Sequence, residues 1–233
     1  GGESCSLSLH AASPPGEKVT LWRVDWGDGS GIQELPGDQA VAEHIFEDDS
    51  ARLPGGTCKI RVTAVDCDGA YRAEKAVTVA NAAPVLDVTG PAVVAEGSEY
   101  TVGLAAVDAG RDGLLLWRVD WGDGHVATLA ADATSAAHVY ADSGAATVRV
   151  EAVDEDGTWP AAPLAVAVVD VPPTTVLAGP NEVDEGAVYA LRIGPPQDAG
   201  RDTVTALTVD WDDGCVEVFP DPAPGPGGSV PSF

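Results

Sequence analysis

The chain of 233 residues carries 37 acidic and 12 basic side chains, a formal net charge of −25 at pH 7. Such a surface repels phosphate backbones and anionic lipids, which excludes nucleic-acid binding as an expected function and leaves divalent cations and cationic partners compatible with the charge. No run of about 18 apolar residues is present, so we expect no membrane insertion in this segment.

The apolar content favours β-structure with many turns. Hydrophobic residues make up 45% of the chain, methionine is absent, and aromatic residues are only 6%. The apolar residues are mostly Ala and Val, and Val prefers strands. The 27 glycines and 18 prolines are scattered along the chain, which suits short strands joined by turns rather than long helices.

A six-residue motif recurs along the chain. VDWGDG begins at residue 24 and again at residue 119, and VDWDDG begins at residue 209. Other landmarks keep this spacing: DAGRD at 108–112 and 198–202, AVD-x-DG at 64–69 and 152–157, and His-x-aromatic at 44–46 and 138–140. A period of about 90 residues is too long for a solenoid unit and fits a β-sandwich domain. We therefore expect three domains, at residues 1–80, 81–171 and 172–233.

The first repeat is expected to lack strand A, because residues 2–5 align with residues 97–100, where strand B of the second repeat begins. Its strand C places Trp22, Val24 and Trp26 on one face. We interpret these rings as core packing between sheets, since aromatic side chains bury a large area there. The alternative, a sugar-stacking platform, would need the rings on an outer face, which the alternation opposes.

The second repeat is expected to be complete. Leu115, Trp117, Val119 and Trp121 occupy alternate positions, the period-two pattern of a strand with one buried face. Short strands separated by turn residues indicate a β-sandwich. The expected strands A, B, C, C′, E, F and G lie at residues 85–94, 100–107, 114–121, 126–130, 134–140, 145–153 and 163–169.

The third repeat contains strands A to C and then departs from the pattern. No His-x-Tyr motif, strand F or strand G follows, and residues 220–228 are rich in Pro and Gly. Both ends of the chain are therefore expected to be edges of a longer protein. Half a sandwich cannot cover its own apolar face, so we predict that residues 171–233 are poorly ordered in isolation or pair with another chain.

Together these motifs resemble the PKD (polycystic kidney disease) repeat of bacterial surface and secreted proteins. The family pattern is WDFGDG, then HxY, then a strand rich in Val and Thr. Here Val-Asp-Trp stands where the family has Trp-Asp-Phe, and the third turn reads Asp212-Asp213-Gly214. The resemblance implies an all-β chain of tandem immunoglobulin-like β-sandwiches, extracellular or at the cell surface, that is not an enzyme in itself.

The motif residues are expected to have structural roles. The turn glycines permit positive φ, and the aspartates hold neighbouring backbone groups. The histidines should form hydrogen bonds beside the turn, and the aromatic residue that follows should anchor the corner between strands E and F. A catalytic histidine would need a nucleophile that recurs in step with it, and none does. The motif comprises Asp25, Trp26, Gly27, Asp28, Gly29, His44 and Phe46 in the first repeat, and Asp120, Trp121, Gly122, Asp123, Gly124, His138 and Tyr140 in the second.

The four cysteines have no CxxC spacing and no histidine in ligand spacing, so a zinc site is not expected. Cys5 and Cys58 lie near the starts of strands B and F, on the inward face of each. In an immunoglobulin-like sandwich these strands oppose each other, so we predict a Cys5–Cys58 disulfide and an oxidising compartment. A Cys58–Cys67 bond is disfavoured, because nine residues along one strand span roughly 30 Å.

A calcium site is considered at the pole of the second repeat where the B–C and F–G loops meet. These loops carry Asp108, Asp112, Asp154 and Asp156, and Asp-x-Asp-Gly offers oxygen ligands for a hard cation. The alternative is a solvated acidic turn, where Asp and Gly occur for backbone reasons.

The function that these expectations favour is a non-catalytic structural spacer or adhesion module of a larger surface or secreted protein. The alternative is a glycan- or protein-binding accessory module of a secreted hydrolase. No cofactor is expected, although the acidic loops could bind calcium and so stiffen the module. The expected partners are protein or carbohydrate at the cell surface. An exposed row of aromatic side chains would favour the accessory module.

Overall fold

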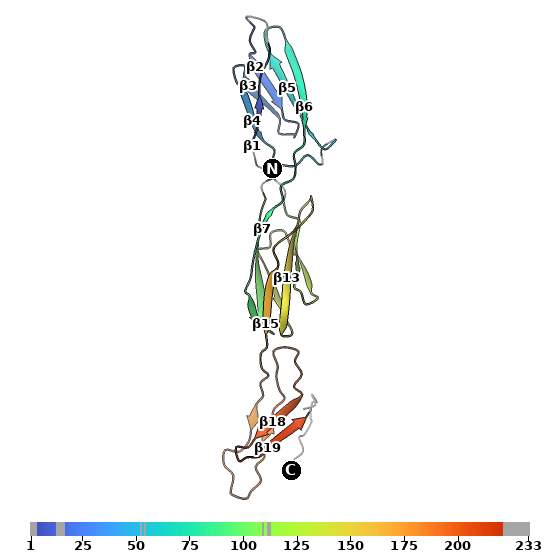
Figure 1. The fold of residues 1–233 in the computed structure, drawn as a ribbon. Coiled ribbons are helices and arrows are strands. Elements are labelled where there is room, and N and C mark those ends of the chain that lie inside the picture. The colour runs from blue at the N-terminus through green and yellow to red at the C-terminus, as the bar shows by residue number, and fades with distance from the viewer. Residues whose placement is uncertain are drawn as a thin grey trace.

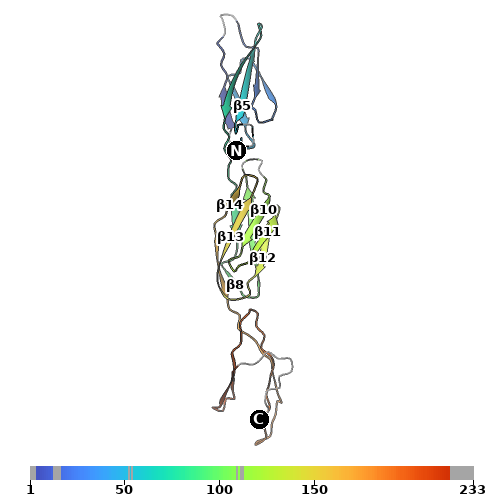
Figure 2. The same ribbon diagram turned by 90° about the vertical axis from the view of Figure 1, so that its right-hand side faces the viewer.

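The computed structural model describes residues 4–12, 17–51, 53, 55–108, 110 and 113–220. These residues form the strands β1 to β19 and no helix, which confirms the predicted all-β class. Accordingly, the described part of the chain contains no helix that could cross a membrane. Figures 1 and 2 show three units that follow one another end to end, formed by β1–β6, β7–β15 and β16–β19.

Two facing sheets form the second repeat. The smaller sheet has the order β12-β9-β7 and contains β7 (Val85–Thr89), β9 (Glu99–Val107) and β12 (Ser135–Val139). The larger sheet has the order β11-β10-β13-β15-β8, with β14 beside β13. Its strands are β8 (Val93–Ala95), β10 (Leu116–Asp120), β11 (Val126–Ala130), β13 (Gly144–Val153), β14 (Thr158–Pro160) and β15 (Leu164–Val169). Strands B to G therefore lie within two residues of their predicted bounds, whereas β14 has no counterpart among the predicted strands.

The single strand A predicted at 85–94 is in fact two strands on different sheets. β7 pairs antiparallel with β9, and β8 pairs parallel with β15. Gly90 and Pro91 separate them, and Pro91 has no N–H to continue a ladder. The Tyr100 hydroxyl donates a hydrogen bond to the Pro91 carbonyl at 3.0 Å, which holds the crossover against the core.

The core of the second repeat lies between the sheets and follows the period-two pattern. Trp117, Val119 and Trp121 are buried beside Val148 and Val150 of the neighbouring strand. Burying one such aliphatic side chain stabilises the fold by about 1.5–3 kcal/mol. Leu115, predicted on the same face as these residues, is instead 60% exposed, because it precedes the first ladder position of β10 at Leu116.

The first repeat has the same layout without strand A among its described residues. One sheet pairs β1 (Ser4–Ser8) with β4 (Val41–Ile45). The other has the order β3-β2-β5-β6 and contains β2 (Leu21–Asp25), β3 (Ile32–Pro36), β5 (Cys58–Val65) and β6 (Ala70–Val77). Trp22, Val24 and Trp26 are buried between these sheets, so the predicted core face is correct.

The third repeat forms two separate ladders. β16 (Leu177–Ala178) pairs with β17 (Arg192–Ile193), and β18 (Ala206–Asp210) pairs with β19 (Val216–Pro220). No described residue between 172 and 220 is buried. Isolated two-stranded ribbons are marginally stable in water, so this unit has strand geometry without a core of its own.

Candidate functional site

The recurring turn is built by short aspartate-to-backbone hydrogen bonds. In the second repeat, Asp120 Oδ1 accepts a hydrogen bond from the Gly122 amide at 3.0 Å, and Asp123 Oδ1 accepts one from the His125 amide at 3.0 Å. Gly122 and Gly124 have φ values of 83° and 97°, a region that favours glycine. The turn thus closes on its own side chains and reverses the chain between β10 and β11.

The first glycine of the turn also meets a close approach of backbone. A Cβ at Gly122 would lie 2.5 Å from the Thr147 carbonyl oxygen and 2.7 Å from the Thr147 nitrogen. A Cβ at Gly27 would meet Lys59 at 2.4 Å in the same way, whereas Gly124 has nothing within 4 Å. Strand F therefore passes directly over this glycine, a constraint that the turn pattern alone does not reveal.

The motif histidine joins the turn to the aromatic core. His138 Nε2 lies 2.7 Å from Asp123 Oδ2, and the imidazole stacks on Trp121 with ring centroids 5.0 Å apart. Tyr140 contacts the same imidazole edge-on and donates a hydrogen bond to the Trp121 carbonyl at 2.9 Å. One histidine thereby ties strand E to the end of strand C.

Two pKa shifts follow from this packing. Burial alone would raise the pKa of Asp123, but hydrogen bonds from the His125 amide and from His138 lower it to about 2. Burial, together with the neighbouring Tyr100 and the Asp123 charge, raises the pKa of Tyr140 to about 12. At neutral pH Asp123 is therefore a charged acceptor and Tyr140 a neutral donor, which are the forms that these contacts require.

The first repeat makes the same contacts with one informative difference. His44 Nε2 lies 2.6 Å from Asp28 Oδ2 and stacks on Trp26, and Phe46 replaces the tyrosine. The Ser30 hydroxyl donates to Asp28 Oδ1 at 2.6 Å. The order is therefore Ser–Asp–His, in which the histidine cannot take the serine proton as it does in a Ser–His–Asp triad. Nothing in this cluster activates a nucleophile.

Asp123, His125 and His138 bring three potential metal-ligand atoms within 4.8 Å of one another. His125 Nδ1 lies 3.1 Å from Asp123 Oδ2, the same oxygen that His138 contacts. The ligand atoms are therefore already engaged with one another. The first repeat has Ser30 in place of His125 and keeps the same turn, which indicates that the group serves the turn.

The predicted disulfide is not formed. Cys5 and Cys58 contribute to one core cluster, but both are free thiols. A bridge requires Cα atoms about 4.4–6.8 Å apart. Alternation along the strands identifies the inward face of each cysteine but does not fix the separation between two cysteines on facing sheets. Burial and the nearby Asp28 charge raise the pKa of the Cys58 thiol.

The aspartates considered as calcium ligands are engaged with turn backbone. Asp154 is buried, and its Oδ1 accepts hydrogen bonds from the Asp156 and Gly157 amides at 2.8 Å each. Asp154 Oδ2 accepts from the Trp159 indole N–H. Asp108 Oδ1 accepts from the Gly110 amide at 2.7 Å, whereas Asp112 lies outside the described residues. Asp108 and Asp154 therefore hold turn backbone, which is the backbone role that Asp has in such loops.

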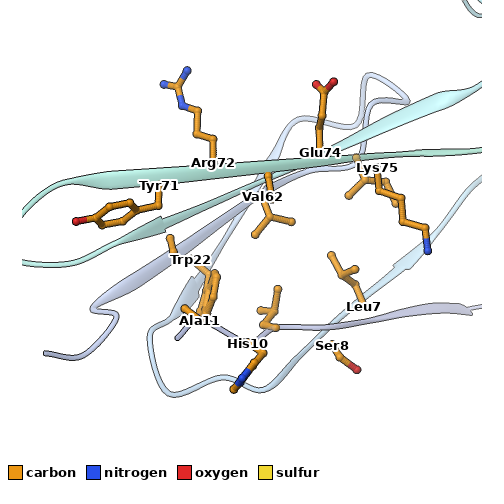
Figure 3. A pocket seen from close by; sticks show the side chains of 14 residues that line it. Leu7, Ser8, His10, Ala11, Trp22, Val62, Tyr71, Arg72, Glu74 and Lys75 are labelled. Atoms are coloured by element: carbon orange, nitrogen blue, oxygen red, sulfur yellow. The ribbon is translucent and has the colours of Figure 1, made fainter. Parts of the chain in front are cut away.

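An apolar groove of about 320 Å³ opens on the first repeat between β1 and β6. Figure 3 shows Leu7 and Trp22 below it and Tyr71 on the strand above. Tyr71 is 57% exposed, but Trp22 is only 5% exposed. The exposed aromatic side chains of the described chain are Tyr71 in the first repeat and Tyr189 and Trp211 in the third. The rings of Tyr189 and Trp211 meet edge to face with centroids 6.2 Å apart, whereas Tyr71 lies far from them in the chain, so the three do not form one row along the molecule.

The second repeat, with its facing sheets and Trp–His–Asp turn, is an immunoglobulin-like β-sandwich. The family model of the PKD domain matches residues 81–168, and this repeat is accordingly a PKD domain. Among solved structures, the PKD domain of an M14-like peptidase from a Thermoplasmatales archaeon is similar at 23% identity and a TM-score of 0.32, over 38% of this chain and 98% of that one.

The fibronectin(III)-like modules of CbhA from Clostridium thermocellum are similar at 17% identity and a TM-score of 0.34, over 72% of this chain and 86% of theirs. No curated protein matches the chain.

Proposed function

We propose that the chain is a non-catalytic spacer in a larger extracellular or cell-surface protein, holding its neighbours apart. The observation that carries the proposal is the end-to-end succession of three units (Figure 1). The recurring motif residues form turn hydrogen bonds and aromatic packing contacts inside each sandwich. A domain whose recurring side chains face inward keeps its shape while its surface is free to vary.

The connections between repeats support a semi-rigid rod. At the first connection, Ser50 is fully buried, and its hydroxyl accepts a hydrogen bond from the Val79 amide at 3.0 Å. At the second, Glu96 Oε1 accepts one from the Val171 amide at 2.9 Å. Each of these hydrogen bonds lies within one repeat and fixes the point at which the following linker begins. The segments at 80–84 and 171–174 are short and contain proline, which limits their conformational freedom.

Small-angle X-ray scattering of the full chain tests this proposal. A compact globule of 233 residues would have a radius of gyration of about 17 Å, and three units in a row must exceed that value clearly. A pair-distance distribution with one narrow cross-section and a long tail is expected. A radius of gyration near the compact value would refute the spacer.

The alternative of a glycan-binding accessory module has less support. Trp22, Trp26, Trp117 and Trp121 are each at most 5% exposed, so their faces are not open to stack on sugar rings.

The acidic surface and the PKD family of the second repeat support an extracellular location. Detection of the parent protein on intact cells with an antibody to this segment would test that location.

A further inference from the structure

The junction between the second and third repeats contains a buried carboxylate that is only half satisfied. Glu96, in the turn between β8 and β9, has 0% exposure. Its Oε1 accepts the hydrogen bond from the Val171 amide, but its Oε2 is buried and has no hydrogen-bond partner among the described residues. A buried carboxylate is strongly disfavoured unless a proton or a cation compensates it.

The Glu96 carboxylate lies among further carboxylates. Glu96, Asp142 and Asp202 each offer one oxygen, and these three atoms lie within 4.8 Å of one another. Asp142 comes from the loop between β12 and β13, and Asp202 from the loop between β17 and β18 of the third repeat. The cluster therefore collects acidic side chains from three loops and from both sides of the junction.

Two glycines seat the loop of the third repeat against Glu96. A Cβ at Gly200 would lie 2.7 Å from the Glu96 carboxyl carbon, and a Cβ at Gly97 would lie 2.3 Å from the Ala199 carbonyl oxygen. Asp198 in the same loop holds the Gly200 amide at 2.7 Å, while its Oδ2 is a second buried oxygen without a partner among the described residues. Glycines in both loops, Gly97 and Gly200, therefore allow the two loops to lie in close contact.

The cluster accumulates negative charge without a basic side chain paired to it. Arg201 is next to Asp202 in sequence, but in the described part of the chain no ion pair reaches these acids. Carboxylates this close repel one another when all are ionised, and a bound cation would remove that repulsion.

We propose that Glu96, Asp142 and Asp202 bind one Ca²⁺ between the second and third repeats. Oxygen-only ligands select a hard cation. Ca²⁺ accepts six to eight oxygen ligands in flexible geometry, whereas Mg²⁺ demands a near-ideal octahedron and usually keeps several waters, so carboxylates gathered from three loops suit Ca²⁺. The ion would link two repeats, a property beyond the spacer function, which holds with or without it.

The third repeat supplies a matched control position. Asp184-Glu185-Gly186 repeats the sequence pattern of Ala95-Glu96-Gly97, but Glu185 is exposed and belongs to no ligand cluster in the described residues. Glu96→Gln keeps the shape of the side chain and removes its charge, and Glu185→Gln makes the same change where no ion should bind. Asp202→Asn provides a second variant at an exposed site that folding does not require.

Isothermal titration of the full chain with CaCl₂ at constant ionic strength is the test. The unmodified chain and Glu185→Gln should bind one ion with a dissociation constant on the order of 10⁻⁴ M, typical of extracellular modules, and Ca²⁺ should raise their melting temperature by linkage. Glu96→Gln and Asp202→Asn should bind at least tenfold more weakly. Absence of heat and of a melting shift at millimolar Ca²⁺ would overturn the proposal, and so would affinity unchanged in both variants.

Discussion

Replacing Gly122 with alanine tests whether the motif glycine is required by the turn or by the strand that crosses it. The cost should contain two parts. An alanine at φ 83° costs about 1–2 kcal/mol relative to its preferred conformations. Its Cβ must also move away from the Thr147 carbonyl oxygen, which would lie 2.5 Å away where an ordinary C···O contact is about 3.3 Å.

The backbone cannot readily shift by the roughly 0.8 Å that the added Cβ would require. The Asp120↔Arg149 pair and its neighbours hold β10 and β13 in register, and Gly122 lies two residues after the end of β10. Forcing an extra carbon into packed structure costs about 1–3 kcal/mol. We therefore expect Gly122→Ala to lower the free energy of unfolding by about 2–5 kcal/mol.

Gly124→Ala is the matched control. Gly124 has φ 97°, and a methyl group added there would have no atom within 4 Å, so this variant should show only the conformational cost of about 1–2 kcal/mol. Urea denaturation followed by tryptophan fluorescence measures both variants, as the change of the unfolding transition relative to the unmodified chain, to which Trp117 and Trp121 contribute beside Trp22 and Trp26 of the first repeat. Equal destabilisation of the two variants, within about 0.5 kcal/mol, would refute the close approach as the reason for this glycine.

Two other predictions concern acid stability and the third repeat. The folded-state pKa of Asp123 is lowered from 3.8 to about 2, so its stabilisation is present above pH 3.8 and is lost as the pH falls through about 2. Because Asp123 is exposed and solvent screens its charged contacts, Asp123→Asn should cost about 1 kcal/mol or less at pH 7 and flatten the pH dependence of unfolding in that acid range; an acid profile identical to that of the unmodified chain would contradict this. Because no described residue between 172 and 220 is buried, limited proteolysis of the monomer should remove residues 171–233 before it cuts 82–170, and equal protease resistance of the two segments would show that the third repeat is stabilised by contacts other than a core.

The fold could be predicted from sequence because its signals are local. Alternation at Trp117, Val119 and Trp121 marks a strand with one buried face, and a repeat of about 90 residues marks sandwich-sized domains. The same signals give a wrong prediction where burial or sheet membership depends on which residues pair between strands. Leu115 keeps the alternation but lies before the first paired residue, and strand A changes sheets at Gly90 and Pro91.

The candidate sites were less accessible to sequence. The acidic loops at Asp108 and Asp154 stand out because Asp-x-Asp-Gly is a compact pattern, whereas Glu96 is a single acid in a short turn. Its recurrence as Glu185 and the aspartates of the DAGRD loop were the available signals. Glu96 stands out only because loops of two repeats meet around its carboxylate. A sequence pattern within one repeat cannot reveal a contact between two repeats.

The sequence by itself determined the repeat, the strand faces and the hydrogen-bonding role of the turn aspartates, because these depend on neighbours a few residues away. The tertiary structure alone decided distances between segments far apart in the chain. Strand F passes over Gly122, Cys5 and Cys58 share one core cluster as free thiols, and a loop of the third repeat approaches Glu96. Such distances depend on how sheets and domains pack, and the chain order of the residues involved does not contain them.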